Sequence, residues 1–89
     1  MHDFYFAKEI LDQVLLTAKE HHLKKVNRAT IKLGEFIEHD EEILPANLKN
    51  NFQLLAKNTI AQGAELIIHK FAKNNHWELT EIDGDKKYF

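Results

Sequence analysis

The chain has 89 residues, of which 44% are hydrophobic and 29% charged, and its formal net charge is -2. This composition predicts a single domain over residues 1–89 with one modest core. Lysines and arginines are scattered, which argues against nucleic-acid binding, and the lack of cysteine excludes disulfides and thiolate zinc sites. Without a signal-like start or an apolar run of membrane-spanning length, we expect a soluble, cytoplasmic protein with no membrane partner.

The first three residues, Met1-His2-Asp3, bring several metal donors together. The amine of Met1 and the amide nitrogen of His2 can close one chelate ring, and this amide with the His2 Nδ1 can close a second. Asp3 can complete the plane through its amide or its carboxylate. A planar set of nitrogen and oxygen donors favours Ni(II) or Cu(II) over zinc or magnesium.

A first helix is predicted from Phe4 to about His21, because apolar residues recur at steps of three and four. The inward-facing positions are Phe4, Ala7, Ile10, Leu11, Val14, Leu15 and Ala18. Asp3 suits the N-cap of this helix, and this role can coexist with metal binding because the N-cap N–H has no intrahelical acceptor. His21 and His22 suit the negative end of the helix dipole better than a metal site.

Alternation from Val26 to Leu33 predicts a half-buried strand that Gly34 ends. The following segment, Glu35 to Glu42, is acidic and is expected to be a solvated loop. A second helix begins at Pro45 and is closed by Asn58, which tolerates the left-handed conformation of a helix end. Its inward positions are Leu48, Phe52, Leu55 and Ala56.

Two further strands are predicted at Ala64 to Phe71 and His76 to Asp83, with Ala72 to Asn75 as a tight hairpin loop between them. This loop length would place Ile68 opposite Leu79 and His69 opposite Glu78. An Asp83-Gly84 turn is then expected to lead into a short tail over residues 84–89.

The order helix, strand, helix, strand, strand predicts an α+β fold. We expect two helices packed on one face of a three-stranded mixed sheet, with the last two strands as an antiparallel hairpin. Ile67 and Phe71 would then alternate toward the opposite face of the sheet. That face is a candidate surface for a homodimer.

Four segments, taken in order along the chain, resemble the HypA/HybF family of nickel-insertion chaperones. They are Met1-His2-Asp3 before a helix, Leu33-Gly34-Glu35 after a strand, FQLLAKNT at residues 52–59, and IAQGAEL at residues 60–66. The resemblance implies that the terminal amine, His2 and neighbouring backbone amides bind nickel(II) transiently. It also implies delivery to the large subunit of nickel-iron hydrogenase, together with the GTPase HypB.

By this resemblance, His2 is the side-chain nickel ligand, Met1 and Asp3 assist it, and Glu35 is a candidate partner behind the ligands. The sequence departs from the family at three places. Asp3 replaces the usual Glu, and the acidic loop is longer by residues that include His39. The zinc domain with its two Cys-x-x-Cys pairs is absent, so we expect no bound zinc.

Two functions are compatible with these residues. The first is a nickel metallochaperone for hydrogenase maturation. The alternative is a metal-free interaction or dimerisation module that keeps the fold without transferring metal. An enzyme is not expected, because the sequence has no nucleophile motif and no phosphate-binding loop.

Overall fold

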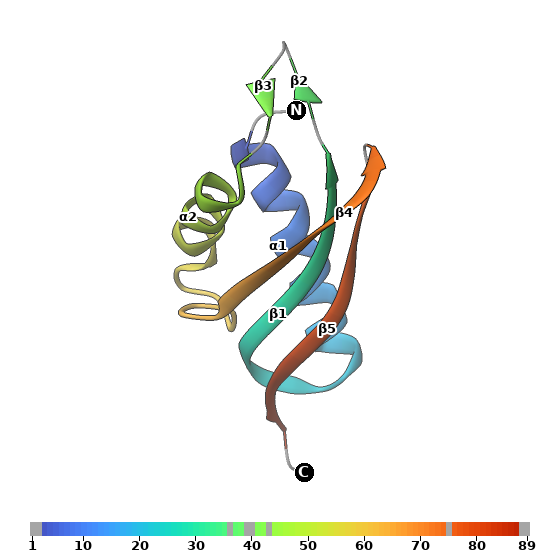
Figure 1. Cartoon of the computed structure of the whole chain (residues 1–89). Coiled ribbons are helices and arrows are strands. Elements are labelled where there is room, and N and C mark those ends of the chain that lie inside the picture. Colours follow the sequence, from blue (N-terminus) through green and yellow to red (C-terminus); the bar gives the residue numbers. More distant parts are fainter. Residues whose placement is uncertain (1–2, 36, 39–40, 43, 75, 88–89) are drawn as a thin grey trace.

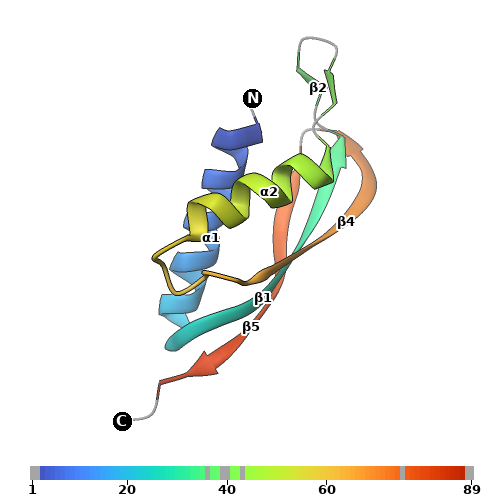
Figure 2. The ribbon, with the colours of Figure 1, turned by 90° about the vertical axis from the view of Figure 1, so that its left-hand side faces the viewer.

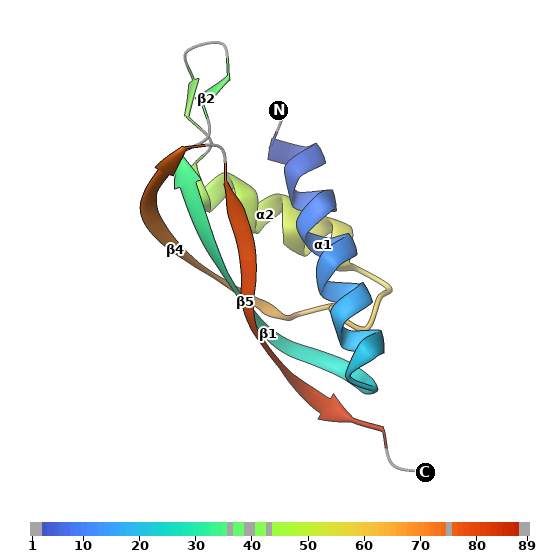
Figure 3. The same ribbon diagram turned by 90° about the vertical axis from the view of Figure 1, so that its right-hand side faces the viewer.

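The computed structural model describes residues 3–35, 37–38, 41–42, 44–74 and 76–87. Two helices lie on the same face of a mixed three-stranded sheet (Figures 1, 2 and 3), so the predicted α+β fold is confirmed. A short two-stranded hairpin is added within the acidic segment. The elements are α1 (Asp3–Glu20), β1 (Leu23–Glu35), β2 (Ile37–Glu38), β3 (Glu41–Glu42), α2 (Pro45–Ala56), β4 (Glu65–Asn74) and β5 (Trp77–Lys86).

The first helix, α1, buries the predicted apolar stripe with one exception. The side chains of Ala7, Ile10, Val14 and Ala18 are fully buried against α2 and the sheet, and so is that of Phe6, which was not predicted to face inward. Phe4, predicted to face inward, is 47% exposed. It lies in the first turn, where fewer neighbouring residues are available to cover it.

The end of α1 is closed by His22, which adopts the left-handed conformation with φ of 57°. Its position explains why a helix that ends at Glu20 turns at once into β1. The N–H of His22 donates to the carbonyl of Lys19 at 3.2 Å, and the His22 carbonyl accepts from the N–H of Lys87 at 2.8 Å. His22 therefore joins the end of the helix to the end of the chain's last strand.

The sheet has the strand order β4-β1-β5, which overturns the predicted β4–β5 hairpin. Strand β1 pairs in parallel with β4 and antiparallel with β5. The predicted tight loop at 72–75 is also wrong, because β4 continues to Asn74. Ile68 and Leu79 both pair with Ile31, from its two sides. The predicted direct pairing of Ile68 with Leu79 is therefore wrong, because β1 lies between their strands.

Both edges of β1 are hydrogen-bonded in this order, which is the physical reason to prefer it over the hairpin. Strand β1 runs over 13 residues, longer than predicted, and its Ala29, Ile31 and Leu33 are at most 1% exposed. A final hairpin would have left one edge of this buried strand without partners for its backbone groups. His69 and Glu78 consequently both pair with Lys32, from its two sides, and do not pair with each other.

The second helix, α2, begins at Pro45 as predicted, and Leu48, Phe52 and Ala56 are fully buried while Leu55 is half-buried. Asn58 has a left-handed φ of 66°, which confirms its predicted role after the helix. The following loop is held by its own polar groups. The Thr59 hydroxyl donates to the Ala56 carbonyl at 2.7 Å, and the Asn58 N–H donates to the Gln62 side chain at 2.9 Å.

The last strand, β5, extends to Lys86, so the predicted turn at Asp83-Gly84 is wrong and residues 84–86 belong to the strand. Gly84 pairs with Val26 beside an irregularity in the ladder. A Cβ atom at Gly84 would overlap the carbonyl oxygen of Lys25. The glycine is needed here because two backbones approach closely, not because the chain reverses.

The sheet face away from the helices is charged over the residues described. Arg28 in the central strand lies 3.7 Å from a carboxylate oxygen of Glu65 on β4 and 3.7 Å from one of Asp83 on β5. Ile67 is half-buried, and the side chain of Phe71 lies outside the described part of the structure. A charged face of this kind is typical of a solvated sheet surface and does not favour the predicted homodimer.

Among the described residues, α1 and α2 both lack the combination of length and hydropathy that a membrane-crossing helix requires.

Candidate metal site at the chain start

The predicted nickel ligands lie at the beginning of α1. Met1 and His2 are outside the described residues, and α1 begins at Asp3. The first N–H groups of a helix have no acceptor within that helix, so the backbone at Asp3 is available for a cap or for a metal. Asp3 is thus the first residue of the helix rather than its predicted N-cap. Its side chain is outside the described part, so its metal role stays a prediction.

The first turn of α1 is fixed to the sheet by two aromatic side chains. Phe6 is fully buried, and its ring lies 5.8 Å from the ring of Trp77, centroid to centroid, at an interplanar angle of 58°. Trp77 begins β5 and pairs with Leu33 of β1. These contacts place the start of α1 at the carboxyl end of β1 (Figure 3).

Glu35 is the last residue of β1, two positions after Leu33. The structure therefore brings its backbone to the same end of the molecule as the start of α1 (Figure 1). The role of Glu35 behind the nickel ligands stays a prediction. The Glu35 side chain lies outside the described part, so its contacts stay predictions.

The surface next to the predicted ligands is aromatic and open to solvent, which the sequence did not indicate. Phe4 is 47% exposed and Tyr5 is 65% exposed, and their rings meet edge to face with centroids 5.7 Å apart. Tyr5 was not singled out from the sequence because it falls off the apolar stripe of α1.

The acidic segment contains a short hairpin where the sequence predicted only a solvated loop. Ile37 pairs with Glu42, and Glu38 pairs with Glu41, in antiparallel β2 and β3. This hairpin extends from the end of β1, at the end of the molecule where α1 begins (Figure 2). His39 and Asp40, which lie between the two strands in the sequence, are outside the described residues.

The other histidines do not form a metal site within the described ranges. No group of three histidine, aspartate or glutamate side chains in those ranges is arranged to hold an ion. The predicted contact of His69 with Glu78 is wrong, because β1 separates their strands. His21 and His22 belong to the closed end of α1, as predicted.

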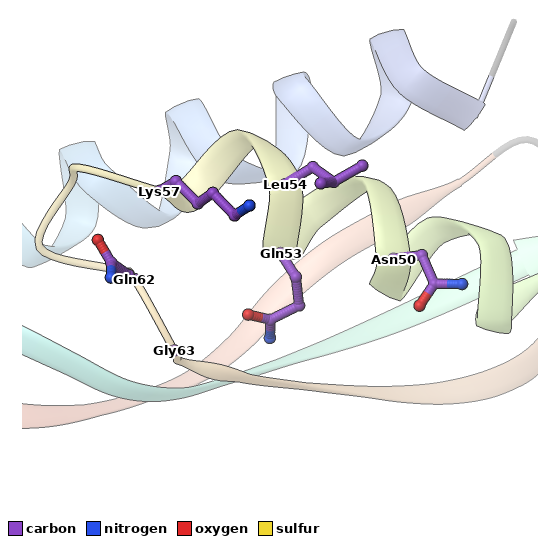
Figure 4. Close-up of a pocket in the computed structure, with 6 residues that line it drawn as sticks. All are labelled: Asn50, Gln53, Leu54, Lys57, Gln62 and Gly63. Atoms are coloured by element: carbon purple, nitrogen blue, oxygen red, sulfur yellow. The ribbon is translucent and has the colours of Figure 1, made fainter.

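A surface pocket beside α2 has a lining unsuited to a metal ion (Figure 4). Gln53 crosses from α2 to donate a hydrogen bond to the carbonyl of Ala64, which ties the helix to the segment before β4. The lining offers amides, an ammonium group and apolar carbon, without a carboxylate or an imidazole. Its residues are Asn50, Gln53, Leu54, Lys57, Gln62 and Gly63.

Comparison with known proteins identifies the family. Residues 1–76 match the HypA family, described as "Hydrogenase/urease nickel incorporation, metallochaperone, hypA". The hydrogenase maturation factor HypA of Methanosarcina barkeri is 38% identical over 68 residues, which cover 76% of this chain and 48% of that protein. The HypA of Archaeoglobus fulgidus is 37% identical over 68 residues, covering 76% of this chain and 58% of that protein. The chain thus spans about half the length of the curated relatives it matches.

The fold has a counterpart among solved structures. The solution structure of the Ni metallochaperone HypA from Helicobacter pylori superposes with a TM-score of 0.76 at 12% sequence identity, covering 98% of this chain and 100% of that chain. The lack of cysteine fits the predicted absence of a zinc site. The matched family consists of metallochaperones rather than enzymes, in agreement with the sequence-based prediction. By the match over residues 1–76, this chain belongs to the HypA family of nickel metallochaperones.

Proposed function

We propose that this chain binds Ni(II) at its first three residues and delivers it during the maturation of nickel-iron hydrogenase. The observation that carries this proposal is the family match, which begins at residue 1 and therefore includes the donors of Met1 and His2. A helix that begins at Asp3 supports it further, because the N–H groups at its start lack intrahelical acceptors.

The proposed coordination uses the chain start as a planar chelate. The Met1 amine, the His2 amide nitrogen and the His2 Nδ1 supply three donors, and Asp3 supplies the fourth through its amide or carboxylate. A helix N-terminus repels a bare cation, but deprotonated amides remove most of the charge of the bound ion. Ni(II) and Cu(II) both favour this geometry, and the divalent affinity order puts copper above nickel. The family, rather than affinity, therefore selects nickel as the cargo.

Glu35 has a proposed role in orienting the imidazole. When Nδ1 of a histidine binds a metal, the other ring nitrogen, Nε2, keeps its proton and can donate a hydrogen bond to a carboxylate. This hydrogen bond fixes the orientation of the ring. Glu35 ends β1 on the side of the molecule where α1 begins, and so it is the proposed acceptor.

Delivery requires that the ion be reachable by a recipient. Phe4 and Tyr5, directly after the proposed ligands, are both exposed, so a recipient protein can approach the chain start. We propose the hydrogenase large subunit as the recipient and a HypB-type GTPase as the second partner, in keeping with the family. The matched segment covers 48% of the relative from Methanosarcina barkeri, so both partners are proposed from this matched part.

The proposal is tested by titrating nickel into the protein with a native N-terminus, by calorimetry, beside two single variants. His2→Ala should weaken nickel binding by at least about 100-fold. Loss of a residue that only supports a metal ligand already weakens binding by up to about 100-fold, and His2 is a proposed ligand itself. His69→Ala should leave the affinity unchanged, because His69 is an exposed residue of β4. Equal affinity in all three proteins would overturn the proposal and leave the metal-free interaction module as the function.

A further inference from the structure

Strand β5 forms one edge of the sheet, and a groove runs between this edge and α1. The two elements lie side by side in Figure 3. Within the residues described, β1 is the only strand that pairs with β5, so the outer edge of β5 carries no strand partner. The groove is lined by Gln13, Thr17, His21, Leu79, Thr80, Glu81 and Ile82.

The groove is centred on an irregularity of β5. The register with β1 shifts between Thr30 and Ile31, which leaves Thr80 as the extra residue of the strand. The Thr80 hydroxyl donates to the carbonyl of Thr30 at 3.2 Å, so the extra residue is held in place by β1. Such a bulge hinders a long strand from adding along the whole edge, while short segments on either side remain able to pair.

The side chains of β5 divide into an apolar row and an acidic row. Leu79 and Ile82 are half-buried and line the groove on the helix side. Apart from Thr80, the exposed positions carry four carboxylates and one lysine. They are Glu78, Glu81, Asp83, Asp85 and Lys86. By contrast the exposed residues of β4, among those whose side chains are described, are Glu65, His69 and Lys70.

We propose that the β5 edge is a docking site for an extended segment of a partner protein in which apolar residues alternate with lysine or arginine. Its backbone would pair with the outer edge of β5 from Glu81 to Asp83, on one side of the bulge. Its apolar side chains would enter the groove beside Ile82, and its cations would lie beside Glu81 and Asp83. A second copy of β5 is disfavoured as the occupant, because like charges would face each other across the new pair. This inference does not depend on nickel binding.

The test uses a capped synthetic peptide of sequence Gly-Lys-Val-Lys-Val-Arg-Val-Gly, titrated into the labelled full chain and followed by amide chemical shifts. We expect shifts along β5 and at Thr17, and weaker binding as salt is added. The matched peptide with glutamates in place of the three cations should fail to bind. Glu81→Lys should weaken binding of the basic peptide by at least about fivefold. Shifts confined to β4, or no binding at all, would overturn the proposal.

The chain offers a matched pair of variants as a control for folding. Asp83 on β5 and Glu65 on β4 each lie 3.7 Å from Arg28, so Asp83→Lys and Glu65→Lys each remove one contact of the same guanidinium. We expect similar thermal stability in both and weaker peptide binding only in Asp83→Lys. Equal weakening in both would contradict docking at the β5 edge. If these variants fail to fold, a peptide with alternate backbone amides methylated tests whether docking uses backbone pairing. Methylated amides cannot donate hydrogen bonds, so this peptide should not bind the unmodified protein.

Discussion

At the scale of single residues, three positions between elements and one position within a strand have special backbone geometry. His22, Asn58 and Gly63 have left-handed φ angles, and Gly84 lies where two strands approach closely. Asn58 could be predicted because its chemistry suits a helix end. Gly84 could not, since Asp-Gly is typical of turns and only the packing of Lys25 against it reveals the other reason for a glycine.

Gly84→Ala is expected to lower the free energy of unfolding by about 2 kcal/mol, because the new Cβ overlaps the backbone of Lys25 and a strand must shift. Gly63→Ala is the control. It has no atom within 4 Å of the new Cβ and only a φ of 77° to strain, so about 1 kcal/mol is expected. Urea unfolding measures both, and a larger loss for Gly63→Ala would contradict the role given to Gly84.

Glu35→Gln tests the residue behind the proposed nickel ligands. A neutral amide accepts a weaker hydrogen bond from the imidazole, so nickel affinity is expected to fall by about tenfold. Glu65→Gln is the control. Glu65 also lies in the sheet but pairs with Arg28, away from the end of β1, so nickel binding should be unchanged. Calorimetry of the two variants distinguishes them, and equal affinities would remove Glu35 from the site.

At the scale of elements, the packing of α1 on β5 decides where the chain start lies. The sequence predicted the apolar stripe of α1 but not its contact with Trp77, because the stripe does not reveal which strand it will meet. The buried ring of Phe6 supplies this contact and orients the first turn of the helix. The first turn of α1 is therefore positioned by the contact between the rings of Phe6 and Trp77.

Phe6→Leu is expected to cost about 1 kcal/mol of stability and to change the emission of Trp77, the single tryptophan of the chain. Phe4→Leu should alter both much less, since Phe4 is 47% exposed. Thermal unfolding and fluorescence are recorded on the same samples. Unchanged Trp77 emission in Phe6→Leu would contradict the contact between the two rings.

At the scale of the whole molecule, the elements were predictable and the order of the strands was not. The alternation in β1 and the apolar run of β4 are local patterns, visible in the sequence. In the sheet β4 occupies one edge of β1, and β5 pairs with the other edge rather than with β4. This choice depends on the assembled sheet and not on a local sequence pattern. The short hairpin of β2 and β3 was missed because acidic residues have low strand propensity.

The strand order is tested by nuclear Overhauser effects between side chains. Ile31 should show contacts to both Ile68 and Leu79, since it pairs with each. Ile68 and Leu79 should show none to each other, because strands on opposite sides of a third lie about 10 Å apart. A direct Ile68 to Leu79 contact, without contacts from Ile31 to both, would restore the hairpin.

The central claim is that the free amine at the chain start is part of the nickel site, and one comparison tests it without altering any side chain. Nickel is titrated into the native protein and into the same chain with four glycine and serine residues before Met1. Four are needed because one added residue would place the imidazole third in the chain, where an amine, two amides and a ring nitrogen form a new planar site. The extended protein is predicted to bind nickel at least about 100-fold more weakly, and equal affinity would contradict the account.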